Sequence, residues 1–193
     1  AFSPESVLGC VVYPAAEIIE PGVIKHIEGN RFSLGEPNGV KSQRVKKLSE
    51  ILTNASLRAP VRSNIRTEIW VKLWGNLSFN PTSVLTHATL DKLCTDSGVR
   101  NIIRLMMKEA EEIANKLGVT FPIDVEKRIE GGAAVGAHQT SMLQDIISGR
   151  PLELDAMLGS VQELGGLVKT KTPTIDIIFA LTKLREAVNL STR

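Results

Sequence analysis

A change in hydrophobic pattern after residue 62 is the feature that most restricts what this chain can fold into. Residues 7–35 contain β-branched and alternating segments bounded by glycine and proline, a pattern typical of short strands. From Ser63 onward, every long segment has apolar residues at helical spacing. The sequence therefore predicts an α+β fold that is mainly α, with a small β-rich region at residues 1–62 and an all-helical domain at residues 63–193.

Capping residues and prolines delimit the expected helices. Ser63 or Asn64 is suited to cap the first long helix of the second region. Pro151 and Pro173 each suit the first position of a later helix, where proline's missing N–H is not needed. The helices expected along the chain cover approximately residues 42–54, 64–80, 82–93, 98–117, 122–131, 140–148, 151–168 and 173–190.

Composition excludes several classes of protein. The net charge is +2 with the basic residues spread along the chain, so nothing indicates the dense basic patch of a nucleic-acid-binding protein. No apolar run reaches about 18 residues, so no membrane span is expected. Two well-separated cysteines, Cys10 and Cys94, are expected to be reduced and buried, which fits a cytoplasmic protein. None of the three histidines has a partner at metal-ligand spacing, so no metal site is expected.

A polar stripe runs through the segment EIWVKLWGNLSFNPTSV, residues 68–84. Its members Glu68, Lys72, Asn76 and Asn80 recur every four residues, and on a helix they form one slowly winding ridge. Pro81 disfavours helical geometry at the residue before it, so the ridge is expected to end there at a kink or a helix terminus. Gly75, inside the helix, permits close approach by another group.

Two interpretations of the ridge remain open. In the first, it is a solvated edge on which Glu68 and Lys72 form an ordinary ion pair. In the second, it is a half-buried ligand site, because asparagine is unfavourable on an exposed helix surface and Trp74 and Phe79 flank the ridge. One amine and two amides suit a small polar ligand.

A second polar cluster lies in TSMLQDIISGRPLELDAMLG, residues 140–159. Ser141 and Asp145 are four residues apart on one helix face, and Glu153 and Asp155 are expected in the first turn of the next helix. Carboxylates are favoured in a first turn by the helix dipole alone, and this explanation covers at least one of the two.

Both clusters resemble signatures of the ketopantoate reductases, also called 2-dehydropantoate 2-reductases. Residues 70–81 are similar to the pattern W-x-K-x-x-x-N-x-x-x-N-P, and residues 141–155 to SMLQD followed by GR-x-x-E-x-D. The segment GCVVYPAAEIIEPGVIKHIEGNRFSLGEP is also similar to strands of that family. The resemblance covers essentially the whole chain in the family's order.

The resemblance implies a division into a C-terminal remnant of a Rossmann-type dinucleotide-binding domain, residues 1–62, and a helical catalytic domain, residues 63–193. The helical part is expected to resemble the C-terminal domain of 6-phosphogluconate dehydrogenase. The family's G-x-G-x-x-G turn, which holds the NADP pyrophosphate, has no counterpart here. GGAAVGA at residues 131–137 has the wrong spacing and follows a helix. The cofactor NADPH is therefore expected to bind mostly to a segment absent from this chain, which alone is expected to be inactive.

The resemblance also assigns roles to individual residues. Lys72 corresponds to the proton donor to the substrate ketone, and Glu153 to a glutamate that meets the cofactor ribose and the lysine. Burial would lower the pKa of Lys72, whereas Glu68 or Glu153 would raise it. The remaining roles fall to Asn76, Asn80 and Ser141, as substrate-binding residues, and to Ala16, where the backbone passes the nicotinamide.

The expected function is NADPH-dependent reduction of 2-dehydropantoate to pantoate in pantothenate and coenzyme A biosynthesis. Leu158 and Thr174 stand where the family often has asparagine, so a reductase of another 2-oxo acid is one alternative. A non-catalytic helical assembly module of the same ancestry is another. The resemblance also allows a homodimer formed through the helical domain.

Overall fold

The computed structural model describes residues 3–191 and divides into two units, Ala1–Lys72 and Leu73–Arg193, which are described separately below. The division falls inside helix α2 (Ile65–Thr86), later than the boundary expected after residue 62. Within residues 3–191, every strand precedes α1, and the chain after it forms helices apart from two isolated bridges, so the predicted α+β, mainly α fold is confirmed.

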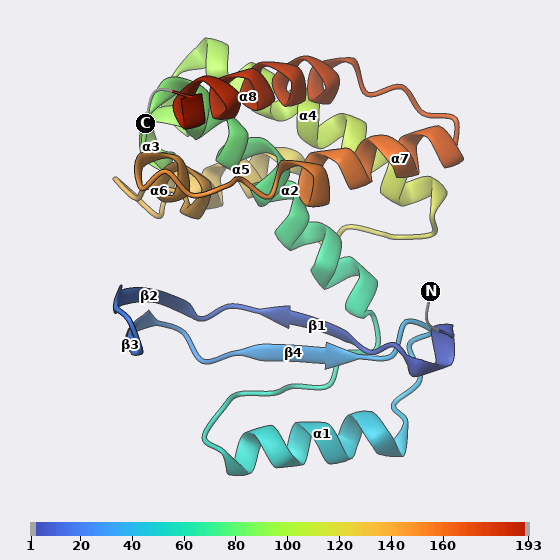
Figure 1. The fold of residues 1–193 in the computed structure, drawn as a ribbon. Coiled ribbons are helices and arrows are strands. Elements are labelled where there is room, and N and C mark those ends of the chain that lie inside the picture. The colour runs from blue at the N-terminus through green and yellow to red at the C-terminus, as the bar shows by residue number, and fades with distance from the viewer. Residues whose placement is uncertain (1–2, 192–193) are drawn as a thin grey trace. The chain divides into compact units, whose positions relative to one another are not determined.

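The strands of the first unit form two separate antiparallel pairs (Figure 1). β1 (Gly9–Val12) pairs with β4 (Phe32–Gly35), and β2 (Ala15–Glu20) forms a hairpin with β3 (Val23–Glu28). A short 3₁₀ turn, η1 (Pro4–Ser6), precedes β1. The chain after α1 returns to β4 through parallel bridges, Arg31 with Arg58 and Leu34 with Val61.

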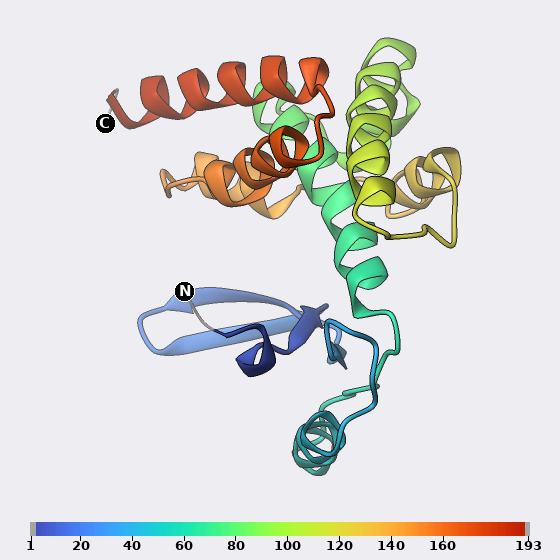
Figure 2. The ribbon, with the colours of Figure 1, turned by 90° about the vertical axis from the view of Figure 1, so that its right-hand side faces the viewer.

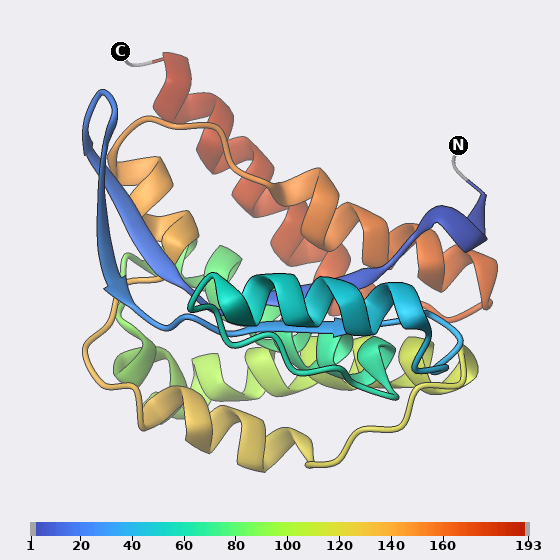
Figure 3. The ribbon, with the colours of Figure 1, turned by 90° about the horizontal axis from the view of Figure 1, so that it is seen from below.

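Helix α1 (Gln43–Asn54) runs alongside β4 and covers its apolar side (Figure 3). Ser42 caps the helix, as predicted, by accepting a hydrogen bond from the backbone N–H of Val45 at 3.2 Å. Val45, Leu34 and Ala59 form the core of this unit, and four more apolar side chains pack on it: Leu8, Leu48, Leu52 and Val61.

Two glycines let the start of α2 pack directly on β1 and β4. A Cβ atom added at Gly9 would lie 2.7 Å from Ile65 Cγ1, and one added at Gly35 would lie 2.6 Å from Ile65 Cβ. Ile65 is itself buried, so either glycine replaced by a larger residue would displace the first turn of α2.

The second unit consists of helices gathered around α4 (Figures 1 and 2). α4 (Ser97–Lys116) packs against α3, α5, α7 and α8, and Trp74 Nε1 of α2 donates to its Met107 carbonyl oxygen at 2.8 Å. α8, red in Figure 2, lies at the outer margin of the unit. The other elements are α3 (Leu90–Thr95), α5 (Val125–Ala133), α6 (Ser141–Ile147), the π-helical turn η2 (Asp155–Gly159), α7 (Ser160–Leu167) and α8 (Pro173–Ser191). No helix among residues 3–191 combines the length and the apolar character needed to cross a membrane.

The sequence predicted a kink or a helix terminus at Asn80, and the terminus is excluded because α2 continues through Pro81 to Thr86. The segment predicted as a helix over residues 82–93 is therefore split between the end of α2 and α3. The whole stretch 77–84 is buried. Tertiary burial there outweighs the local preference against helix at a residue that precedes proline.

The prediction that a helix begins at Pro151 is also wrong. Residues 151–153 are not helical, and helical structure resumes only at Leu154, which leads into η2. The backbone N–H of Leu152 donates to Glu186 Oε1 of α8 at 2.6 Å, so a contact with a distant helix holds this segment. Glu153 consequently lies before the helix and not in its first turn.

Both cysteines are free, but only Cys94 is buried as predicted. Cys10 is exposed because successive side chains of a strand point to opposite faces. Its neighbour Val11 points into the buried side of β1.

Candidate functional site

Helix α2 presents the polar ridge. Its N-terminus is capped by Asn64, whose Oδ1 accepts from the backbone N–H of Thr67 at 3.3 Å. On the buried side, the hydroxyls of Ser78 and Thr82 each donate to the carbonyl oxygen four residues earlier, at 2.7 Å. These hydrogen bonds within α2 satisfy the buried hydroxyls near Pro81. The hydroxyls therefore do not need the side chains of the ridge as partners.

Lys72 lies half-buried in the first unit, next to the end of β1. Its Nζ donates to the carbonyl oxygen of Val12 and lies 5.5 Å from the centre of the Tyr13 ring. Burial lowers the pKa of Lys72 from its usual value, and the nearby Cys10 opposes that shift. A lysine with a lowered pKa is a better general acid near neutral pH.

Glu68 does not form the ion pair with Lys72 that the solvated-edge interpretation requires. Its Oε1 lies 2.5 Å from Nε of Arg62, and the hydroxyl of Tyr13 donates to its Oε2 at 3.5 Å. Lys72 therefore forms no ion pair with the carboxylate one turn before it. The interpretation of the ridge as a solvated edge predicted that ion pair, and the structure does not contain it.

The two amides of the ridge lie in the second unit and have no hydrogen-bond partner among the described residues. Asn80 is only 6 % exposed, and Asn76 is half-buried. An amide that the folded chain leaves unpaired keeps its two N–H donors and its oxygen acceptor available. Such a group is expected to bind water or a ligand.

A buried hydrogen bond joins α2 to the second motif. Ser83 Oγ donates to the carbonyl oxygen of Asn80 at 2.6 Å and lies 2.6 Å from Thr140 Oγ1. Thr140 in turn caps α6 by accepting from the N–H of Leu143 at 3.2 Å. Ser141, the next residue, is exposed, and its hydroxyl has no partner within residues 3–191. The structure therefore brings the second half of the ridge and the start of the second motif to one place.

The acids of the second motif fall into two groups. Asp145 accepts from Arg150 Nε at 2.8 Å, and Asp155 from Lys183 Nζ at 2.8 Å, so each has an internal ion-pair partner. Glu153 is exposed, and its carboxylate contacts no polar group in the part of the chain that the structure describes. Of these three acids, only Glu153 is left to meet a ligand.

Gly75 allows close approach by Arg128 of α5. The sequence predicted a close approach at Gly75 but did not indicate which residue makes it. A Cβ atom at Gly75 would collide with Arg128 Nη2, and the guanidinium carbon lies 5.2 Å from the centre of the Phe79 ring. Beside it, Trp74 stacks on Phe121 with ring centres 3.8 Å apart. Aromatic rings and a guanidinium thus support the helix beside the ridge.

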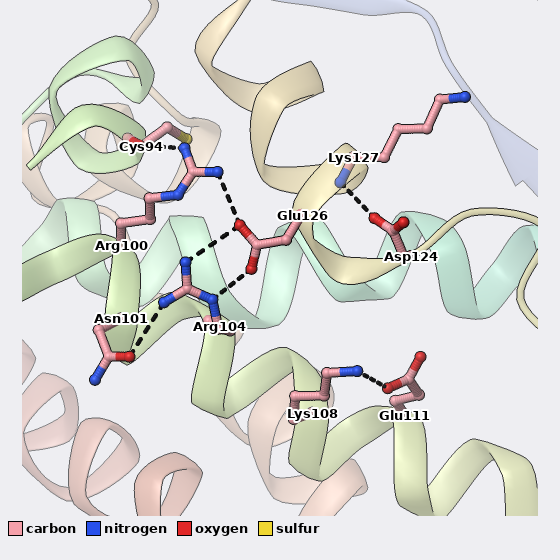
Figure 4. A network of polar contacts seen from close by, with 9 residues as sticks. All are labelled: Cys94, Arg100, Asn101, Arg104, Lys108, Glu111, Asp124, Glu126 and Lys127. Carbon is pink, nitrogen blue, oxygen red and sulfur yellow. Dashed lines mark hydrogen bonds and ion pairs between the residues drawn. The ribbon is translucent and has the colours of Figure 1, made fainter. Parts of the chain in front are cut away.

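Another polar cluster in this unit joins α4 and α5 through ion pairs (Figure 4). Glu126 of α5 accepts from Arg100 Nη2 at 2.9 Å and also binds Arg104, both from α4. Hydrogen bonds from Arg104 and then Arg100 lower the pKa of the Glu126 carboxyl to about 2. Asn101 belongs to the same cluster, since its Oδ1 accepts from Arg104 Nη1 at 3.1 Å.

The remaining candidate residues have simpler positions. Ala16 is an exposed residue of β2, paired with His26 of β3. GGAAVGA forms the end of α5 and the loop after it, so it is not a strand–turn–helix unit. Within residues 3–191, no three His, Cys, Asp or Glu side chains lie close enough to hold a metal ion.

Sequence reasoning missed two residues that build the site. Thr140 links α6 to α2. It stands directly before the helical segment SMLQD, where a threonine is a favoured N-cap, and this local signal could have pointed to Thr140. Glu186 holds the segment next to Glu153, but it lies so far along the chain that no local pattern indicates it.

Comparison with known proteins places this arrangement among the ketopantoate reductases. The sequence model of the family "Ketopantoate reductase PanE/ApbA C terminal" matches residues 64–186 of this chain. A 2-dehydropantoate 2-reductase of Mesorhizobium japonicum is 57% identical over 180 residues, which are 93% of this chain and 55% of that protein.

The chain is also similar to solved protein structures. A crystal structure of 2-dehydropantoate 2-reductase from Methylococcus capsulatus is 32% identical with a TM-score of 0.84, covering 94% of this chain and 63% of that one. A D-mandelate dehydrogenase solved with NADH has the same fold, with 22% identity and a TM-score of 0.88 over 96% of this chain and 64% of that one. The chain thus spans little more than half of its curated relative from Mesorhizobium.

Proposed function

Because the chain belongs to the ketopantoate reductase family, we propose that it is the substrate-binding and catalytic part of an NADPH-dependent 2-dehydropantoate 2-reductase. The reaction is the reduction of 2-dehydropantoate to pantoate, in the cytoplasm, for pantothenate and coenzyme A biosynthesis. Residues 1–62 are the end of the dinucleotide-binding domain in this proposal, and residues 63–193 are the catalytic domain.

One observation carries the proposal: α2 bears Lys72, Asn76 and Asn80 at four-residue intervals, and the nearly buried amide of Asn80 has no partner within residues 3–191. The two amides are proposed to bind the hydroxyl and carbonyl oxygens of the substrate. Ser141 is proposed to donate to its carboxylate. A substrate bound there would supply the hydrogen bonds that these amides lack among the described residues.

Lys72 is proposed to give its proton to the ketone oxygen of the substrate. Hydride arrival at the carbonyl carbon leaves negative charge on that oxygen, which needs a proton or a positive charge beside it. The lowered pKa of Lys72 supports this role, because proton transfer from a half-buried ammonium is easier than from an exposed one.

The bound nicotinamide would supply the hydride. Glu153 fits such a cofactor, because its exposed carboxylate has free acceptor atoms, within the described chain, for the hydroxyls of a ribose. Ala16 is proposed to lie along the nicotinamide, and Glu153 also to approach Lys72. A ligand-bound structure of the complete enzyme with Lys72 and Glu153 on opposite faces of the helical body would contradict this assignment.

The test is a steady-state assay with NADPH and 2-dehydropantoate, run on the complete enzyme and on the 193-residue chain alone. The complete enzyme is expected to turn over, and the chain alone is not, because the pyrophosphate needs the helix N-terminus of a glycine-rich turn. Turnover by the isolated chain, or none by the complete enzyme, would contradict the proposal.

A related reductase of another 2-oxo acid remains the second candidate. The two residues that depart from the family pattern do not favour it, since Leu158 is fully buried and the N–H of Thr174 donates to Glu109 Oε1 at 2.8 Å. Both have packing or capping roles. The same assay with other 2-oxo acids distinguishes the candidates, and a complete enzyme that reduces none of them would instead favour a helical assembly module.

A further inference from the structure

Lys72 is held in the first unit by groups that do not take its proton at neutral pH. A lysine side chain is a flexible four-carbon stem, so an ammonium that must meet one atom of a ligand needs contacts that fix it. The carboxylate one turn earlier, Glu68, forms an ion pair with Arg62 instead. The contacts that hold the ammonium are the carbonyl oxygen of Val12 and the face of the Tyr13 ring.

The ring of Tyr13 is itself fixed from several sides. The guanidinium carbon of Arg31 lies 3.7 Å from the ring centre, and the backbone N–H of Tyr13 donates to the carbonyl oxygen of Arg31 at 2.9 Å. The hydroxyl donates to Glu68 Oε2 at 3.5 Å, and Glu68 is held in turn by Arg62. Because Tyr13 is also half-buried, a cation that lies over its ring has a well-defined position.

An aromatic face is a suitable support for a proton donor. It attracts an ammonium within about 6 Å of its centre, and Lys72 Nζ lies 5.5 Å away. A carboxylate in the same place would also hold the ammonium, but it would raise the pKa of Lys72 and oppose release of the proton. With the ring there instead, burial still lowers the pKa of Lys72. One N–H of the ammonium binds the Val12 carbonyl, so donors remain for a ligand.

The hydroxyl of Tyr13 is a poor alternative to Lys72 as the proton donor. Burial, and then the charge of Glu68, raise the pKa of this hydroxyl above its usual value. It therefore stays protonated near neutral pH, and it already donates to Glu68. The ring and the hydroxyl thus have different tasks: the ring contacts the lysine, and the hydroxyl anchors the ring.

We propose that Tyr13 is a positioning residue for Lys72, with its ring holding the ammonium where the ketone oxygen of the substrate receives the proton. The inference rests on the proposed function, in which Lys72 is the proton donor, and adds a residue that neither of the two polar motifs contains. A misplacement of about 1 Å at a reacting group can lower a rate about 10²-fold. A partial displacement of the lysine is therefore expected to cost about tenfold.

Steady-state kinetics of the complete enzyme with NADPH and 2-dehydropantoate tests this role. Tyr13→Leu, which removes the ring, is expected to lower kcat about tenfold and to leave KM nearly unchanged, because the ridge amides are untouched. Tyr13→Phe keeps the ring and is expected to restore most of the lost kcat. Phe179→Leu is the matched control, because Lys183 Nζ lies 5.2 Å from the centre of the Phe179 ring, outside the candidate site. This control should keep the wild-type kcat.

Nuclear magnetic resonance of the complete enzyme with ¹³C-labelled lysine tests the contact itself, without reference to activity. The ring of Tyr13 should shift the Cε proton signals of Lys72 upfield in the wild type and in Tyr13→Phe, but not in Tyr13→Leu. The signal that is missing from Lys72→Ala identifies the lysine. An unshifted signal in the wild type would overturn the proposal.

The kinetics of Lys72→Ala, measured beside these variants, separate the two possible failures. Wild-type kcat in Lys72→Ala contradicts the proposed proton donor, and the role of Tyr13 falls with it. A large loss in Lys72→Ala together with wild-type kcat in Tyr13→Leu overturns only the role of Tyr13. An equal loss of kcat in Tyr13→Leu and Tyr13→Phe would assign the effect to the hydroxyl and also overturn the role of the ring.

Discussion

Two polar clusters of the helical unit differ in how their groups are paired. In the cluster around Glu126, Oε1 accepts from Arg104 and Oε2 from Arg100, both of α4, and the Oδ1 of Asn101 also accepts from Arg104 (Figure 4). In the ridge on α2, the amide of Asn80 is nearly buried and has no partner among residues 3–191. The carboxylate of Glu126 is therefore paired within the protein, whereas the partners of the two ridge amides are proposed to come from a bound substrate.

Residue type alone does not tell which polar residues of a helix have a structural role and which bind a ligand. Asparagine occurs in both clusters, and outside them Asp155 is paired with Lys183 whereas the nearby Glu153 has no partner among residues 3–191. What separates structural from ligand-binding groups is whether the folded chain already supplies the hydrogen bonds. Changes in the paired cluster should therefore alter stability, and changes in the ridge should alter activity.

The largest expected effect is that of Lys72→Ala. In the complete enzyme this change should lower kcat about 10²–10⁴-fold, the usual contribution of a general acid. Lys108→Ala is the control, because Lys108 pairs with Glu111 in the paired region of Figure 4. Steady-state kinetics on both variants measures the difference, and an unaltered kcat for Lys72→Ala would remove the lysine from its role.

The next effect is that of Asn80→Ala, which should lower kcat/KM about ten- to hundred-fold, by the 1.36 kcal/mol-per-decade relation. Helix propensity favours alanine, so the melting temperature should be equal or higher. Asn101→Ala, from the paired cluster, should leave kcat/KM unchanged. Equal activity of the Asn80→Ala enzyme would return the ridge to the solvated-edge interpretation.

The smallest effect is on stability, in Glu126→Gln. The carboxyl is partly exposed, so loss of its charge should lower the free energy of unfolding by only about 0.5–1 kcal/mol at neutral pH. Its folded pKa of about 2 lies below the ordinary 4.5, so this contribution is complete above pH 4.5 and is lost as the pH falls toward 2.

Urea unfolding of the Glu126→Gln and wild-type chains at several pH values measures this contribution. The two curves should converge in acid. Glu130→Gln on the same helix, where the described structure gives the carboxylate no partner, should match the wild type throughout. A constant difference between Glu126→Gln and wild type down to pH 2 would contradict the assigned cause of the pKa shift.

Local signals in the sequence predicted much of the fold. The cap at Ser42, the first position of α8 at Pro173 and the succession of strands and helices all follow from short-range patterns. The sequence also indicated that Gly75 would admit another group, which is Arg128. The positions proposed for the site came from motif resemblance and stay predictions.

The errors arise where distant contacts outweigh local preference. Burial of residues 77–84 carries α2 through Pro81, and Glu186 of α8 holds the segment after Pro151 out of a helix. Neither contact leaves a pattern within a few residues of the place it affects. The same is true of Arg62, which takes Glu68 away from Lys72.

The most direct test of the central claim is the response of side-chain amide signals to substrate. With the complete enzyme labelled with ¹⁵N and saturated with NADPH, titration with 2-dehydropantoate should shift the NH₂ resonances of Asn76 and Asn80. The NH₂ resonance of Asn101, in the paired cluster, should not move. Shifts at Asn101 with none at Asn76 and Asn80 would show that the unpaired ridge is not where the substrate binds.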